Sequence, residues 1–433
     1  CRLQGRPKYL QIFSKLAIDK GTNQMLEILD AGLEALLLYE AYSTLSSLHK
    51  RSLQCLSIFR EPMSFQGLQA IYGEKDIGNA IRYLSERRLL DIDNGSISMH
   101  PMVRAHIYNS LRKTKKIVLH AEAAKYFGNV NKTVTRSNFG DYVEAHWHAC
   151  QAQDYDRAYE IIFENRVDDY LRRWGYSRLL SNIYQILVVR DNKITQILSE
   201  LQRHCNVLRN LGKAYSDLGR LRLAIDYLNQ AFNISKRIKD YRIQYEALGN
   251  LGTVYSNLGY LKESIYYYSR GIKVVRKYTE VSGTLEGKKT ESLWLGYLGL
   301  EYAYSGELQK AEEICKQALD ISKEIKDSES ENRNLCNLGF VYLQMRKLDK
   351  AILYFQQAVD ASKKADKRGG GRALGYLGRT YLVNGQLDKA LWALRKAIKI
   401  AHDVGDYRRE GIWEGYLGGV YVKKSKTDTA LKH

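Results

Sequence analysis

A segment of about 40 residues repeats along the second half of the chain, and this repeat constrains the fold more than any other feature of the sequence. A Leu-Gly pair recurs with its glycine at positions 212, 252, 299, 339, 378 and 418, so successive copies are 40, 47, 40, 39 and 40 residues apart. One insertion, at 281–290, accounts for the longer spacing. Regular repeats of this length are typical of proteins in which each unit packs only against its neighbours.

Each copy shares further positions that predict two helices. Counted from the glycine, Tyr recurs at +3, Gly usually at +7, an apolar residue usually at +9, and Ala or Ser at +12. Steps of three, four and seven place these residues on one helix face. We expect the +7 glycine to end the first helix in a left-handed cap. We expect the small residues to let an antiparallel second helix approach closely, with the Tyr filling the space that they leave. Only 3 of 433 residues are proline, which favours uninterrupted helices.

These shared positions resemble the tetratricopeptide repeat (TPR), with a period near 40 instead of 34. The resemblance implies a right-handed α-solenoid of six units over 206–433, the last one truncated before its second helix. It also implies a groove, lined by the first helix of each unit, that binds a protein or peptide. We expect residues three before and one after the glycine to face this groove, as Arg209 and Lys213 do in the first unit. In the fifth unit we expect Arg372 and Arg379 to do so, because residues seven apart share a face.

In the units between, the corresponding positions hold small or apolar residues: Gly249, Thr253, Gly296, Leu300, Cys336 and Phe340. The groove would then have basic ends and an apolar middle, which suits an amphipathic or acidic-apolar peptide. The alternative is that these basic side chains belong to solvated helix faces.

The segment 46–115 predicts a different kind of unit. Helical periodicity runs over 45–59, a second helix begins near Ser64, and a third covers 76–88. Two short alternating strands follow, joined by Asn94-Gly95, which is a strong hairpin signal. Three helices followed by a β-hairpin is the order of a winged helix, so the predicted fold class is mainly α, with a winged-helix domain followed by the solenoid.

A winged helix has two possible roles here. Its third helix carries Asn79, Arg82, Arg87 and Arg88, which could contact DNA, and the net charge of +19 would attract nucleic acid. We favour a role as a packing module. The alternative is a TPR scaffold or adaptor protein with a DNA-binding winged helix that acts in transcriptional regulation.

Two short motifs resemble those of the NB-ARC or STAND signalling ATPases. The chain starts with CRLQGRPKYLQIF, which is similar to a segment late in their ATPase core, and MHPMVR at 99–104 resembles the Met-His-Asp motif of their winged helix. This resemblance implies that Pro7 packs against the adenine of ADP and that His100 contacts its β-phosphate. Pro101 stands where the family has an acidic residue. By this reading 1–45 ends the helical lid domain, and 116–205 is a helical linker with a degenerate repeat in which Ala158 takes the +12 position.

No GxxxxGK[ST] cradle for a nucleotide occurs, and we interpret GGGR at 369–372 as a linker turn. We therefore expect no catalysis and no cofactor in this chain, with ADP or ATP and Mg²⁺ bound by an upstream ATPase core of a longer protein. His146 and His148 are two apart, a poor metal pair on a helix. The implied function is the sensor arm of a signal-transduction ATPase, with self-oligomerisation possible on activation.

Cysteine usage and hydropathy bear on the compartment. The six cysteines form no CxxC motif, and no stretch of 18 apolar residues occurs. We expect a cytoplasmic protein with reduced thiols and no membrane contact.

Overall fold

The computed structural model describes residues 41–72, 77–128, 133–190, 193–362 and 367–424, and nearly all of them lie in helices. Contacts along the backbone divide the chain into two compact units, 1–199 and 200–433, and each is considered by itself. Pro7 lies outside the described residues. Within these residues no helix is both long and apolar enough to span a bilayer.

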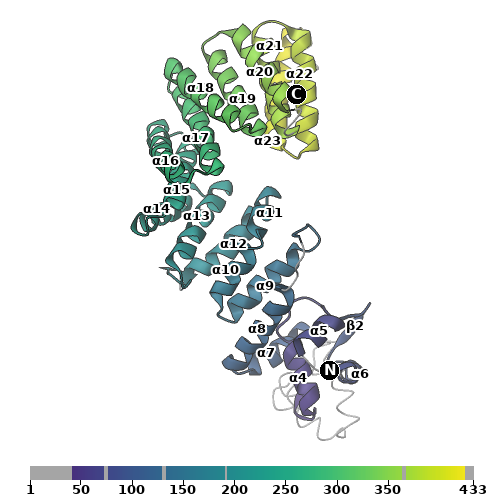
Figure 1. Ribbon diagram of the computed structural model, residues 1–433. Helices are drawn as coiled ribbons and strands as arrows, with labels where there is room; N and C mark the ends of the chain where they lie inside the picture. The colour runs from purple at the N-terminus through teal and green to yellow at the C-terminus, as the bar shows by residue number, and fades with distance from the viewer. Residues whose placement is uncertain (1–40, 73–76, 129–132, 191–192, 363–366, 425–433) are drawn as a thin grey trace. The chain divides into compact units, whose positions relative to one another are not determined.

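The first unit begins with the element order that the sequence predicted (Figure 1). Its elements are α4 (Ser47–Leu56), β1 (Met63–Ser64), α5 (Phe65–Tyr72), α6 (Ile77–Glu86), β2 (Asp91–Asp93), β3 (Ser96–Ser98) and α7 (Pro101–Ser110). The three strands form an antiparallel sheet in the order β1-β3-β2, in which Ile97 pairs with both Met63 and Ile92. At the hairpin, Asn94 and Gly95 both have positive φ, 48° and 78°, which is the geometry that this dipeptide favours.

Longer helices follow in the first unit: α8 (Lys113–Gly128), α9 (Phe139–Gln151), α10 (Tyr155–Phe163), α11 (Val167–Arg173) and α12 (Ser177–Val188), with β4 (Val189–Arg190) paired to β5 (Lys193–Ile194). Helices α9 and α10 pack on each other, and Ala158 is fully buried between them. His146 lies twelve residues earlier, where a repeat unit has its glycine, and its Nδ1 lies 3.1 Å from the Ala158 carbonyl oxygen.

Buried imidazoles join α8 to α9. The Nδ1 atoms of His120 and His148 lie 2.8 Å apart, and the Tyr108 hydroxyl lies 3.2 Å from His120 Nε2. Burial lowers the pKa of His120 to about 4 and that of His148 to about 3, so both rings are neutral near pH 7. No group of three or more His, Cys, Asp or Glu in the described part of the chain could hold a metal ion.

The second unit is an array of antiparallel helix pairs (Figure 1). The first helices of the successive repeats are α13 (Leu201–Asp217), α15 (Tyr241–Asn257), α17 (Leu285–Tyr304), α19 (Ser328–Gln344), α21 (Lys367–Val383) and α23 (Tyr407–Lys423). The second helices are α14 (Leu221–Arg237), α16 (Leu261–Ser282), α18 (Leu308–Glu324), α20 (Leu348–Ser362) and α22 (Leu387–Asp403). This arrangement of packed pairs is the predicted α-solenoid.

Two segments of the second unit are helical. The insertion at 281–290 is almost entirely helical, since it lengthens α16 to 22 residues and α17 to 20, against 17 for α13. The GGGR segment is not a linker turn, because 369–372 lie inside α21. A Cβ at Gly371 would lie 2.7 Å from the Ile400 side chain, so this stretch of helix needs glycine for close packing and not for turning.

The repeated glycine is the contact point between the two helices of a unit. A Cβ built on it would lie less than 3 Å from the residue at +16, on the second helix, in every complete unit. The pairs are Gly212 with Leu228, Gly252 with Tyr268, Gly299 with Cys315, Gly339 with Phe355, and Gly378 with Leu394. The residue at +12 is fully buried beside this contact in each of these units. The expected close approach of the two helices is confirmed.

The Tyr at +3 does not fill the space beside the glycine as expected. In the three units with Tyr at +15 it stacks on that ring instead, with centroids 5.5 Å apart for Tyr215 and Tyr227 and 5.2 Å apart for Tyr342 and Tyr354. The +16 side chain fills the space, because it lies directly over the glycine. The +7 residue ends the first helix as predicted, with φ of 72° at Gly219 and 61° at Arg346.

Gly339→Ala tests this contact. The added methyl group meets the Phe355 ring at 2.8 Å, so the free energy of unfolding should fall by about 1–3 kcal/mol. Gly415→Ala is the matched control, because Gly415 lies in α23 with nothing within 4 Å of a Cβ, and it should raise stability by about 0.5–1 kcal/mol. Urea denaturation followed by circular dichroism measures both. Equal effects of the two substitutions would contradict the assigned contact.

Candidate functional site

The first helices line the inner side of the repeat array. Neighbouring first helices contact each other directly at α13–α15, α17–α19, α19–α21 and α21–α23, whereas no two second helices of adjacent described units come comparably close. A stack that is tighter on one side curves toward that side. The inner surface is therefore made by α13, α15, α17, α19, α21 and α23, as the resemblance implied.

Residues three before the glycine do not face this surface. In the second and fifth units the position is a glycine packed under a Trp of the next first helix, Gly249 under Trp294 and Gly375 under Trp413. In the fourth unit it is Cys336, which is 1% exposed. The prediction of groove residues at this offset was wrong, because neighbouring first helices come together there.

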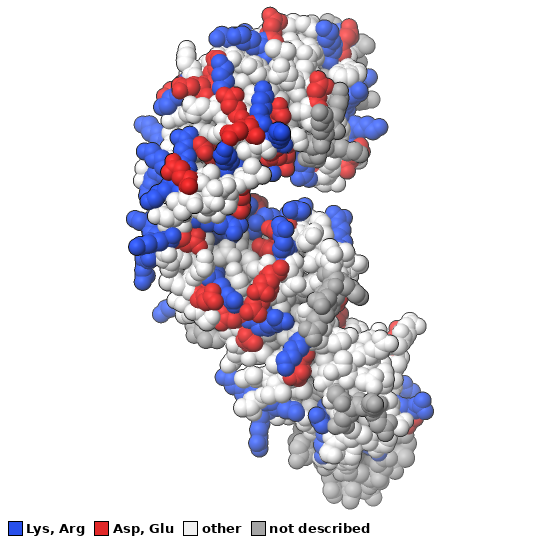
Figure 2. Space-filling model, in the orientation of Figure 1, with Lys and Arg blue, Asp and Glu red and all other residues white. Residues whose placement is uncertain are grey.

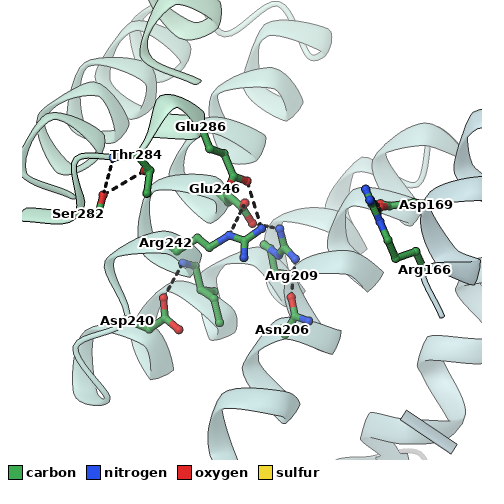
Figure 3. Close-up of polar contacts among 11 residues, drawn as sticks. Arg166, Asp169, Asn206, Arg209, Asp240, Arg242, Glu246, Ser282, Thr284 and Glu286 are labelled. Atoms are coloured by element: carbon green, nitrogen blue, oxygen red, sulfur yellow. Dashed lines mark hydrogen bonds and ion pairs between the residues drawn. The ribbon is translucent and has the colours of Figure 1, made fainter. Parts of the chain in front are cut away.

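Arg209 lies at the same offset in the first unit and is held by neighbouring side chains. Its guanidinium forms an ion pair with Glu246 and a hydrogen bond with Asn206 (Figure 3). Arg242 lies 3.6 Å from Glu246 and 3.2 Å from Glu286, so two arginines and two glutamates balance each other in this network. Arg209 thus belongs to a contact between repeats in which the charges of the arginines and glutamates cancel.

The other predicted residues have separate environments. Lys213 is half-buried on α13. The Arg379 guanidinium lies 5.3 Å from the centroid of the Tyr416 ring, a cation–π contact between α21 and α23. Arg372 lies in a recess with Arg333, Arg368 and Arg409. Arg209, Arg372 and Arg379 therefore contribute to three different contacts and do not form one basic patch.

Aromatic side chains make the continuous feature of the inner helices. We name the row Tyr304, Phe340, Tyr376 and Trp413 the inner aromatic strip; its ring centroids are 5.5, 6.1 and 5.3 Å apart in that order. The four rings come from α17, α19, α21 and α23. Tyr304 is 56% exposed, so the strip is open at that end. Burial raises the pKa of Tyr304 and of Tyr376, so both hydroxyls stay protonated near neutral pH.

Apart from Phe340, the residues of the strip lie at offsets that the sequence prediction of the groove did not include. Tyr304 lies at +5 and Tyr376 at −2 from the glycines of their units, and Phe340 lies at +1. Steps of three and four join these offsets, so they share a helix face. A search for aromatic residues on that face would have found the strip. Of the predicted apolar middle, Phe340 belongs to it.

A buried carboxyl group lies close to the strip. Glu301 on α17 is 4% exposed, and the Ser256 hydroxyl donates a hydrogen bond of 2.6 Å to its Oε1. Burial raises the pKa of Glu301, while hydrogen bonds from Ser256 and Ser264 oppose that shift. The corresponding residues of the second and fourth units are Val254 and Val341, so the third unit carries a charge where its neighbours carry a methyl-bearing side chain.

His100 is the N-cap of α7. Its Nδ1 accepts a hydrogen bond of 3.4 Å from the Met102 backbone N–H, and Pro101 occupies the first helical position. The ring is half-buried at the end of β3, next to the hairpin. The imidazole therefore has a hydrogen-bond partner within its own segment, the Met102 backbone N–H.

Charges are mixed over the second unit. Figure 2 shows Lys and Arg side chains interspersed with Asp and Glu on its visible face. Ion pairs link successive units, among them Lys288 with Glu324 at 2.5 Å and Lys289 with Asp327 at 2.9 Å. In these pairs the lysines lie beside acids, and exposed pairs of this kind contribute little to stability.

Comparisons with known proteins agree with the repeat. A tetratricopeptide repeat family model matches residues 203–277 and 290–364, so the second unit carries tetratricopeptide repeats. No curated protein gives a match. Helices α21 to α23 extend the same architecture beyond the matched residues.

Three solved structures illustrate the similarities. A signal transduction ATPase with numerous domains (STAND) and a tetratricopeptide repeat sensor, from Pyrococcus horikoshii, is 19% identical, with 97% of this chain and 70% of that chain covered and a TM-score of 0.46. Aspartyl phosphate phosphatase F from Bacillus subtilis is 11% identical, with 70% and 94% covered and a TM-score of 0.46. A Rap protein complexed with competence and sporulation factor is 13% identical, with 98% of both chains covered and a TM-score of 0.38.

Glu301→Gln tests the buried carboxyl group. A raised pKa in the folded chain means that this group favours folding fully below its unfolded pKa of about 4.5 and that this contribution is lost as pH rises through the folded pKa. The variant should therefore be more stable than the parent at pH 7, by about 1–3 kcal/mol, and the difference should shrink as pH falls toward 4.5. Denaturant titrations between pH 4.5 and 8 measure this.

Glu301→Val supplies the control, because the neighbouring units carry Val at this place. It should remove the same pH dependence as Glu301→Gln. A difference between parent and variants that does not change with pH would contradict the role of ionisation.

Proposed function

We propose that this chain is the sensor and coupling part of a STAND-type signalling ATPase. Its repeat array binds a protein or peptide trigger, and its winged-helix unit couples that event to a nucleotide switch upstream. The chain itself catalyses no reaction, and ADP or ATP with Mg²⁺ binds in the upstream core. The observation that carries the ligand-binding part is the inner aromatic strip of four consecutive repeats, in which Phe340 and Trp413 are buried and support the partly exposed Tyr376 and the exposed Tyr304.

The strip supports a ligand with apolar side chains. Aromatic residues contribute large contact areas at a low cost in conformational entropy, and they dominate binding hot spots. Tyr304 and Tyr376 add hydroxyl groups that can bond to a peptide backbone, and Arg379 adds a positive charge beside Tyr416. An extended or helical peptide with apolar and acidic side chains fits this combination.

The coupling part rests on the sequence motifs and on the position of His100. His100 is the N-cap of α7, the helix that follows the hairpin, and α8 comes next in the chain. A contact between the imidazole and a bound nucleotide would therefore act directly on the start of α7. Trigger binding would then bias the switch to the extent that the trigger prefers the open state.

Binding of DNA by α6 is the less favoured function. Asn79 and Arg82 are exposed on this helix, but so is Glu86. The neighbouring strand β2 exposes Asp91 and Asp93. Carboxylates beside the recognition surface repel the phosphates that supply most of the affinity for DNA.

Tyr304→Ala tests ligand binding at the strip. With the whole chain as bait, partners held through the strip should be retained at least about tenfold less, because a buried aromatic contact contributes more than 1 kcal/mol. Tyr260→Ala is the matched control, since Tyr260 is also 56% exposed but lies at the start of α16, where its ring is near Tyr255 and no ring of the strip. Quantitative mass spectrometry of the retained proteins measures the effect. Identical retention by the parent and both variants would remove the strip from the proposed function.

His100→Ala and His100→Asn, made in the longer protein that contains an ATPase core, test the coupling. If the ring contacts ADP, both variants should release bound ADP faster than the parent. Asn keeps a side-chain acceptor for the N-cap of α7 but lacks the imidazole, so it separates the two roles of the residue. Faster release by His100→Ala alone would assign the effect to capping, and unchanged release in both would remove His100 from the switch.

A further inference from the structure

A pocket on the side of the second helices is built by α20, α21 and α22. Its volume is about 850 Å³, which lies within the range of small-molecule sites in proteins. The buried side chains of Leu374, Leu377 and Tyr381, all from α21, form its floor. Its sides include Gln356 and Val359 of α20 and Lys389, Trp392 and Lys396 of α22. We name this space the Trp392 pocket.

The fifth unit lacks a ring that three other units supply next to the Tyr at +3. In the first, second and fourth units a Tyr at +15 stacks on that ring, with centroids 5.5, 5.1 and 5.2 Å apart. The fifth unit has Ala393 at +15, and no ring of the described residues stacks on Tyr381. In the third unit the Lys310 Nζ lies 4.0 Å from the centroid of the Tyr302 ring. The Lys389 Nζ lies farther from the Tyr381 centroid, at 5.7 Å, so the fifth unit leaves space that the others fill.

Trp392 adds an exposed aromatic surface to the pocket. It is 52% exposed and lies at +14 from the glycine of its unit, an offset at which the first and third units carry Asp226 and Glu313. Since acidic residues occur at this offset, packing within the array does not require an indole there. A large apolar side chain in contact with water at the side of a pocket suits a flat apolar ligand.

Two lysine ammonium groups border the pocket and lie beside rings. The Lys396 Nζ lies 4.3 Å from the centroid of the Trp392 ring, and the Lys389 Nζ lies on the Tyr381 side. Neither ammonium group forms an ion pair with an acid of the described residues. Both can therefore bind a ligand anion without first breaking an ion pair within the chain.

The two acids in the lining already have partners. Asp388 forms an ion pair with Lys424, and its side chain is 90% exposed, so it points largely into solvent. Asp360, on α20, also has an interaction partner. The groups that remain available to a ligand are thus the two ammonium groups and the rings next to them.

From the absent +15 ring, the exposed indole and the two lysines, we infer that the Trp392 pocket binds a small planar aromatic molecule that carries a carboxylate group. The ligand ring would lie next to Tyr381, where other units place their own Tyr, and would contact the indole. Its carboxylate would accept a charge-assisted hydrogen bond from Lys389 or Lys396. The pocket shares no residue with the inner aromatic strip, so this inference does not depend on the peptide-binding function proposed above.

Isothermal titration calorimetry of the whole chain tests this with four probes at constant ionic strength. 2-Naphthoate should show saturable one-to-one binding. 2-Naphthylmethanol, which keeps the rings without the charge, and cyclohexanecarboxylate, which keeps the charge without a flat ring, should each bind at least about tenfold more weakly. The fourth probe is the capped tripeptide acetyl-Asp-Trp-Asp-amide. Binding of this peptide more tightly than of naphthoate would assign the pocket to a side chain of a protein partner and overturn the inference.

Variants locate the site. Trp392→Ala should weaken naphthoate binding about tenfold or more, and Ala393→Tyr should do the same by restoring the ring that other units have at +15. Tyr266→Ala is the matched control, because Tyr266 is also at +14 and 52% exposed but belongs to the second unit, and it should bind naphthoate as the parent does. Melting curves by circular dichroism exclude variants that fail to fold. Absence of saturable binding, an affinity unchanged in Trp392→Ala, or naphthylmethanol binding as tight as naphthoate would each overturn the inference.

Discussion

The contact between the repeated glycine and the +16 side chain is the interaction on which the second unit depends. It sets the distance between the two helices of each unit, because a single extra methyl group would collide with Leu228, Tyr268, Cys315, Phe355 or Leu394. A helix pair this close leaves no room for a side chain at the crossing, so the stacking of +3 on +15 takes place one turn away. The surface positions then follow from helical geometry, and they are free to carry different chemistry in different units.

The fold was largely predictable from the sequence, and the site only in part. The spacing of the glycines, the +12 small residues and the Asn94-Gly95 hairpin each predict a local structure that depends on nearby residues, and each is confirmed. The partners of Arg209 were not predictable, since Glu246 lies on another helix and its contact depends on how two units stack. Arg333 and Arg372 share the same offset, six before the glycine, so comparing units at that offset would have indicated that the two side chains line one recess.

Equivalent positions in different units carry side chains of opposite charge. At six residues before the glycine, the second unit has Glu246, whereas the fourth and fifth have Arg333 and Arg372. The first case makes a neutral contact that only holds the array together. The second places both arginines in the lining of a recess. A regular scaffold thus allows one place to stabilise the array and another to present charge, with no change in the backbone plan.

The longer spacing between the second and third units has a mechanical consequence. The added residues extend α16 and α17, and the direct contact that joins other neighbouring first helices is sparse between α15 and α17. Trp294, inserted against Gly249 and Gly271, bridges the two units at this junction. The Ser256–Glu301 hydrogen bond and the Arg242–Glu286 ion pair cross the same junction, and α16 packs on α17. The first helices are therefore joined here through side chains, so the bend of the array at this junction depends on side-chain identity more than it does elsewhere.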